Sequence, residues 1–154
     1  MRIATIVLVL AALGAADAGA QVGLKSCPLL ADADAAPVLG AGTQFYSARQ
    51  SPTSTFCSWG GGKDRTLTLN TGSLPAANVA EYRKIAEAMR QADKGTLENG
   101  LGEYAYSTLS AGESEITAAK GKLTLTLTLK GPGLGAGDLV KLRAAAGKAL
   151  AKMP

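Results

Sequence analysis

The sequence predicts an α+β domain in which a strand-strand-strand-helix (βββα) unit occurs twice within one antiparallel sheet. Residues 40–86 align with residues 100–146 without a gap, and 14 of the 47 aligned pairs are identical, where composition alone gives about four. Each copy contains an alternating run of threonine and leucine, followed by apolar residues at helical spacing. Because two copies are too few for a solenoid, we expect halves related by a pseudo-twofold axis, with two main helices on one face of the sheet and a short N-terminal helix.

The identical positions are turn glycines, a tyrosine in each first strand, the alternating run and an arginine in each helix. They include Gly40/Gly100, Gly42/Gly102, Tyr46/Tyr106, the Thr-Leu-Thr-Leu runs at 66–69 and 126–129, and Arg83/Arg143. This distribution indicates that one supersecondary unit is used twice.

Residues 1–20 have the pattern of a signal peptide: a positive start at Arg2, a short apolar run and small residues at the end. This pattern predicts a periplasmic or secreted protein with a single domain over residues 21–154; the alternative is an uncleaved N-terminal anchor. The apolar run is too short to span a bilayer comfortably. Because Lys25 and Ser26 stand where a bacterial lipoprotein needs small residues, no stable membrane anchor is expected.

Two cysteines in an exported chain predict one disulfide, Cys27–Cys57. Closing a loop of that length contributes about 3.6 kcal/mol in the chain-entropy model. Without a Cys-x-x-Cys motif, a structural role is favoured over redox chemistry. The alanine-rich stretch that follows Cys27 and ends at Gly40 predicts the short N-terminal helix, which Pro37 shortens or kinks.

Strands are expected where β-branched and aromatic residues dominate or alternate with other types. In the first copy they are 43–48, 55–59 and 65–70, and in the second copy 104–109, 114–120 and 122–130. Residues 60–64 predict a hairpin turn, because a phosphate loop would need Ser or Thr at Asp64 and a helix after it. The glycine-rich residues 131–137 lack dinucleotide-binding spacing, which favours a flexible linker.

Alternation places the leucines of each third strand on one face and the threonines on the other, so the leucine face is expected to form the core. A helix follows each third strand, with Asn78 and Asp138 as the expected N-caps. Arg83 and Glu87 have the spacing of an i,i+4 ion pair on the first of these helices.

Charge is unevenly distributed along the chain. Residues 21–115 hold 8 basic and 10 acidic side chains, whereas residues 116–154 hold 7 basic and one acidic. A basic end in an exported protein could meet anionic lipid, polysaccharide or nucleic acid, but such charges are more typical of a solvated face. We expect no nucleic-acid partner.

The chain contains no histidine, which removes the commonest general base and metal ligand, and both cysteines are expected to be oxidised. Only Asp32/Asp34 and Glu113/Glu115 are carboxylates spaced two apart, so a carboxylate-pair hydrolase is a minor alternative. We therefore expect no catalytic residues, no cofactor and no metal site.

Four aromatic residues are the candidate ligand-binding residues: Tyr46, Trp59, Tyr104 and Tyr106. The tyrosines share one parity once the repeat shift is applied. If Phe45 points inward, their rings point outward and can line a groove at the pseudo-twofold axis. The alternative is the opposite parity, with buried rings and paired hydroxyls.

Several motifs resemble a known group of proteins. They are Cys27-Pro28-Leu29-Leu30, Leu39-Gly40, Cys57-Ser58-Trp59 and residues 100–106. They are similar to exported bacterial domains of unassigned function that are common among actinobacterial lipoproteins, and to the extracellular sensor domain of certain mycobacterial serine/threonine kinases. The resemblance implies a cell-envelope domain that binds a ligand, with no established catalysis. This chain lacks the lipid-attachment cysteine and the second disulfide of that group.

We therefore expect a secreted or periplasmic, non-catalytic binding module of the cell envelope. Its expected partner is a small molecule, a glycan or an envelope protein, whose identity the residues do not specify. The alternative is an exported inhibitor or immunity-like protein that presents residues 50–55, or the turn that starts at Gly60, to a partner enzyme.

Overall fold

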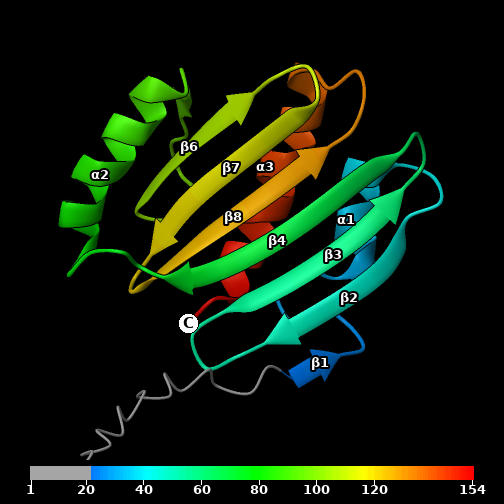
Figure 1. The fold of residues 1–154 in the computed structure, drawn as a ribbon, viewed down its shortest axis with the longest axis horizontal. Coiled ribbons are helices and arrows are strands. Elements are labelled where there is room, and N and C mark those ends of the chain that lie inside the picture. The colour runs from blue at the N-terminus through cyan, green and yellow to red at the C-terminus, as the bar shows by residue number, and fades with distance from the viewer. Residues whose placement is uncertain (1–21) are drawn as a thin grey trace, which may run out of the picture.

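The computed structural model describes residues 22–154 and shows an α+β domain with three helices and one eight-stranded antiparallel sheet (Figure 1). The strand order is β1-β2-β3-β4-β8-β7-β6-β5. The predicted signal peptide, residues 1–20, lies outside the described residues. Within the described part of the chain, no helix is both long enough and apolar enough to cross a membrane.

Six strands form two antiparallel meanders that meet at the centre of the sheet. The first contains β2 (Gln44–Gln50), β3 (Thr55–Gly61) and β4 (Arg65–Ser73), and the second contains β6 (Tyr104–Leu109), β7 (Glu113–Lys120) and β8 (Leu123–Lys130). Two short strands, β1 (Val22–Leu24) and β5 (Thr96–Leu97), extend the outer edges. The helices are α1 (Asp32–Leu39), α2 (Val79–Ala92) and α3 (Ala136–Lys152).

The two meanders join where β4 pairs with β8. Thr68 lies opposite Thr128, which is its equivalent in the repeat alignment. The leucines beside them pair crosswise and are fully buried: Leu67 with Leu129, and Leu69 with Leu127. The leucine face of the sheet therefore forms the core, as the alternation predicts.

Helices α1 and α3 cover this leucine face and lie side by side behind the sheet in Figure 1. α1 contributes Val38 and Leu39, and α3 contributes Leu142 and Leu150 together with several buried alanines. Burial of each such leucine contributes about 1.5–3 kcal/mol. The alanines leave room for α3 to lie close to the sheet.

Helix α2 packs on the opposite face, so the expectation of two main helices on one face is wrong. Tyr82 of α2 packs against Tyr104 and Tyr106 of β6, whose side chains point away from the core residue Ala105 because neighbouring strand residues alternate. α1 already covers β3 and β4 on the leucine face. The two tyrosines supply α2 with an apolar surface on the other side of the sheet.

The segment before α1 is fixed to β3. The predicted disulfide Cys27–Cys57 is present, with the two Cα atoms 5.7 Å apart. The buried Trp59 donates a hydrogen bond from its Nε1 to Asp32 Oδ1 at 2.8 Å. A covalent bond and a polar contact thus hold the start of α1 on the sheet.

The starts of the other two helices differ in how they are capped. Asn78 caps α2 as predicted, because its side-chain oxygen accepts from Glu81 N at 2.9 Å. Asp138 is not the N-cap of α3: the helix is capped at Gly135, and the Asp138 side chain accepts from Gly135 N at 3.1 Å. Asp138 also pairs with Arg65 of β4 at 2.7 Å, and this guanidinium holds the pKa of Asp138 below its usual value.

Candidate functional site

The four aromatic candidates do not meet in one groove. Trp59 is fully buried in the main core, where Phe45 packs edge-on against it with the ring centroids 5.9 Å apart. Tyr46 is 63% exposed and lies over Gly60, because the register of β2 shifts between Phe45 and Ser47. Burial removes Trp59 from any surface, and Tyr46 stays alone near one edge of the sheet.

Tyr104 and Tyr106 lie on β6, near the opposite edge, and are buried beneath α2. The Tyr104 ring is 6.5 Å from that of Tyr82 and 6.4 Å from that of Tyr106, measured between centroids. Burial raises the pKa of Tyr82 to about 12 and raises the pKa of the other two phenols. The rings point away from the leucine face, but α2 covers them, so they form a second, small core.

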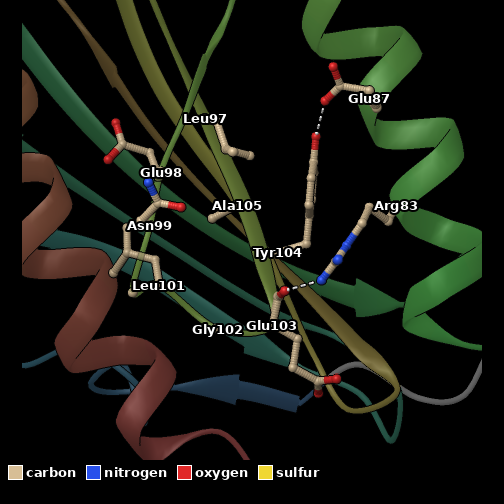
Figure 2. A pocket seen from close by; sticks show the side chains of 11 residues that line it. Arg83, Glu87, Leu97, Glu98, Asn99, Leu101, Gly102, Glu103, Tyr104 and Ala105 are labelled. Atoms are coloured by element: carbon tan, nitrogen blue, oxygen red, sulfur yellow. Dashed lines mark hydrogen bonds between the residues drawn. The ribbon is translucent and has the colours of Figure 1, made fainter.

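Beside this tyrosine cluster, a cleft of about 390 Å³ lies between α2 and the segment that joins β5 to β6 (Figure 2). Arg83 and Glu87 line it from α2, and residues 97–105 provide the remaining walls. This volume falls at the lower end of the range of small-molecule sites in proteins. We call this space the α2 cleft.

Two glycines shape the segment opposite α2. Gly100 and Gly102 have φ angles of 78° and 60°, in the left-handed region that favours glycine. A Cβ atom on Gly102 would lie 2.4 Å from the carbonyl oxygen of Ala119, so only glycine allows this close approach to β7. Between them Leu101 is buried in the main core, which anchors the middle of the segment.

Two arginines at equivalent repeat positions hold this segment from opposite sides. Arg83 of α2 donates from Nη2 to the Glu103 carbonyl at 2.8 Å, and Arg143 of α3 donates from Nη2 to the Asn99 carbonyl. Arg143 also pairs with the Glu98 carboxylate at 3.0 Å. These bonds satisfy carbonyl groups that the irregular backbone would otherwise leave to water.

Two carboxylates of the cleft already have donors within the chain. Glu87 accepts from Arg90 at 2.6 and 2.9 Å and from the Tyr104 hydroxyl at 2.9 Å. These bonds, with that of Arg90 the strongest, lower the pKa of Glu87 to about 2. Glu98 accepts from Ser107 Oγ at 2.7 Å. A carboxylate with so low a pKa is a poor general acid or base near neutral pH.

Arg83 lines the cleft without a carboxylate partner among residues 22–154. Its guanidinium carbon lies 5.7 Å from the centroid of the Tyr104 ring, and Figure 2 shows the side chain between α2 and β6. The predicted Arg83–Glu87 ion pair is not formed. Glu87 pairs with Arg90 instead, which is also fixed by the Gly95 carbonyl at 2.7 Å.

The carboxylates that are spaced two apart in the sequence all form hydrogen bonds or ion pairs within the fold. The spaced carboxylates are engaged as follows: Asp32 with Trp59, Asp34 with Lys148 at 2.6 Å, Glu113 with Lys130 at 2.8 Å, and Glu115 with the hydroxyls of Thr117 and Thr128. In the part of the chain that the structure describes, no group of three or more potential metal-ligating side chains lies together.

Tyr104 is the one cleft residue that the sequence predicted as a candidate site. Leu97, Glu98 and Asn99 belong to no motif, because they lie in a short connection without periodicity. The repeat contained one usable signal: Arg83 and Arg143 are identical at equivalent positions, and in the fold both bind the same segment.

The α2 cleft combines hydrogen-bonding groups, an exposed leucine and a guanidinium with unused donors, a set of groups suited to binding a small polar ligand. The function of the cleft has to be inferred from these groups themselves. Comparison of the chain with known protein families, with curated proteins and with solved structures finds no match.

Proposed function

We propose that the chain is an exported, non-catalytic binding module of the cell envelope, and that its ligand binds in the α2 cleft. The observation that carries this proposal is the cleft itself, whose walls are fixed by hydrogen bonds that Arg83 and Arg143 donate and by one that Glu98 accepts from Ser107. Walls that are already ordered lower the entropic cost of binding.

Export is supported by the signal-like pattern of residues 1–20 and by the disulfide, which is typical of oxidising compartments. The motifs around Cys27, Cys57 and Gly100 that resemble envelope sensor domains support the same assignment.

The proposal includes a duplicated origin for the fold, with a pseudo-twofold axis between β4 and β8. Its support is the pairing of Thr68 with its equivalent Thr128 and a strand order that is symmetric about that junction. The copies differ in the position of their helices. Because α2 lies on the opposite face from α3, the segment 97–105 lies between the two helices, and the cleft forms on the α2 side of it.

The experiment compares two leucine-to-tryptophan variants. Leu97 is 47% exposed and lines the cleft, whereas Leu109 is 45% exposed at the far end of β6 and is not a lining residue. A panel of envelope glycans and small metabolites is screened by thermal shift. We expect a ligand to raise the melting temperature of the wild type and of Leu109→Trp, but not of Leu97→Trp. A ligand that stabilises all three proteins equally would contradict the proposed site.

The inhibitor function is a second candidate, because one predicted loop has an exposed tip and is closed by hydrogen bonds of its own. Ser51 and Ser54 close it with a backbone bond at 2.8 Å and a hydroxyl–hydroxyl bond at 2.8 Å, which leaves Pro52 and Thr53 at the tip. A preorganised tip is favourable for insertion into a partner enzyme. If this function is correct, Thr53→Arg abolishes capture of one tightly bound protein, and Leu97→Trp does not.

A further inference from the structure

We infer that the ligand of the α2 cleft carries a carboxylate group, and that the guanidinium of Arg83 binds it; this inference rests on the proposed function of the cleft. Within the described residues, Arg83 uses one of its N–H donors, from Nη2 to the Glu103 carbonyl. A guanidinium has five such donors in a planar fork. That fork matches the two oxygens of a carboxylate, which it binds through two parallel hydrogen bonds.

Arg83 is oriented before any ligand arrives. The Tyr104 ring lies under the guanidinium at 5.7 Å, and the Glu103 carbonyl accepts from it at 2.8 Å. The ring is itself fixed by the bond from its hydroxyl to Glu87 at 2.9 Å. Figure 2 shows these side chains on one side of the cleft and Leu97, Glu98 and Asn99 on the other. Because the arginine is already held, little side-chain entropy is lost on binding.

The neighbouring acidic side chains do not occupy Arg83. Glu87 and Glu98 are paired with other arginines of the chain. The Glu103 carboxylate accepts from Gly121 N at 2.7 Å, and in Figure 2 it points away from the space between Tyr104 and Asn99. Of the cleft residues in the described part of the chain, Arg83 is therefore the cationic group with donors still available for a ligand.

The rest of the cleft limits the ligand to a small amphipathic acid. Leu97, on the wall opposite Arg83, is 47% exposed and provides an apolar contact for a hydrocarbon body. The volume of about 390 Å³ is small for a ligand site. A doubly charged phosphate would need more than one free cation for comparable compensation. A monocarboxylate with a compact apolar part fits both walls.

The test uses benzoate and its uncharged analogue benzamide as probes, in titrations followed by the backbone amide signals of the ¹⁵N-labelled protein. We expect benzoate to shift the signals of residues 97–105 saturably, and benzamide to leave them unchanged. Arg83→Gln should weaken benzoate binding at least about tenfold, because a charge-assisted pair of hydrogen bonds is lost. Arg83→Lys should bind with intermediate affinity.

The matched control is Lys84→Gln, which removes the same charge from the next residue of α2 without altering a cleft residue. We expect it to bind benzoate like the wild type. Equal binding of benzoate and benzamide, or unchanged benzoate affinity in a folded Arg83→Gln protein, would overturn the carboxylate inference and leave the cleft as a binding site. If neither probe shifts any signal of residues 97–105 up to its solubility limit, both the inference and the proposed site are wrong.

Discussion

Equivalent residues in the two halves of this chain have different surroundings and therefore different roles. Arg143 is neutralised by Glu98, whereas Arg83 donates to one backbone carbonyl and has no carboxylate partner among residues 22–154. Tyr46 is 63% exposed, whereas its equivalent Tyr106 is 4% exposed beneath α2. The residue type determines which contacts a side chain can form. The position of the neighbouring helix determines whether that side chain is exposed to solvent.

The two equivalent tyrosines should respond differently to truncation. Tyr106→Ala removes a ring from the small core and leaves a cavity, so it should lower the free energy of unfolding by about 3–5 kcal/mol. Tyr46→Ala removes a ring that is mostly exposed and should cost about 0.5 kcal/mol or less. Urea unfolding of both variants measures the difference. Equal losses would mean that α2 does not cover β6.

Glu87 predicts a dependence of stability on acid pH. Hydrogen bonds from Arg90, Gln91 and Tyr104 lower its pKa from 4.5 to about 2, so folding favours the ionised form. The resulting stabilisation is fully present above the unfolded-state pKa and is lost as the pH falls through the folded-state value. The difference in stability between the wild type and Glu87→Gln should therefore shrink as the pH falls from about 4.5 to about 2. A difference that is unchanged across this range would contradict the assignment.

At the scale of elements, the strands of the two meanders follow from the sequence, because alternation reports which residues share a face. The sheet face on which a helix packs does not follow in the same way. Helix α2 has an apolar side with Tyr82 and Ala86, but that side fits either face of a sheet. The face on which α2 packs depends on α1, which covers β3 and β4 on the leucine face, and on Tyr104 and Tyr106, which provide an apolar surface on the other face.

The two edge strands and the cleft were beyond prediction from the sequence for a related reason. β1 and β5 contain three and two residues, too few to show a period. The cleft is lined by Arg83 and by a segment about fifteen residues later, and their meeting depends on where α2 lies. Besides the matched Arg83 and Arg143, the repeat offered the glycines of that segment, which indicated a constrained turn.

The turn on which the cleft depends can be tested with two glycines of the same backbone conformation. Gly102 and Gly121 both have φ of 60°. A Cβ atom on Gly121 has nothing within 4 Å, whereas on Gly102 it lies 2.4 Å from the Ala119 carbonyl oxygen. Gly121→Ala should cost about 1 kcal/mol through its left-handed backbone. Gly102→Ala should cost at least about 1 kcal/mol more, because the segment must move off β7. Similar unfolding midpoints for the two variants would contradict this geometry.

At the scale of the whole molecule, the sheet separates a large core from a small one. The large core lies on the leucine face beneath α1 and α3, and the small core lies beneath α2 on the other face. The two cores depend on different attachments. α2 is held by the tyrosine cluster, by the hydrogen bond from the Tyr104 hydroxyl to Glu87 and by the bond from Arg83 to the Glu103 carbonyl. α1 is held by the disulfide and by Trp59. Loss of one attachment should therefore affect one side of the sheet first.

Removal of the disulfide tests whether the two sides of the sheet lose their structure separately. Replacing both cysteines, Cys27→Ser with Cys57→Ser, should lower the free energy of unfolding by about 3.6 kcal/mol, or the melting temperature by about 7–14 °C for a domain of this size. The loss is expected because the bridge restricts the conformations of the unfolded chain between β3 and the segment before α1, and the double variant lacks this restriction. A reducing agent should produce the same loss in the wild type and no further loss in the double variant.

The fluorescence of the single tryptophan can report whether α1 separates from the sheet before the strands unfold. Trp59 is fully buried between α1 and the sheet and bonds Asp32, so release of α1 should shift its fluorescence to longer wavelength. In the double variant this shift should precede the loss of strand signal measured by circular dichroism, because α1 then keeps only non-covalent contacts. Coincident transitions in the double variant, at the wild-type midpoint, would show that the bridge contributes nothing to the attachment of α1.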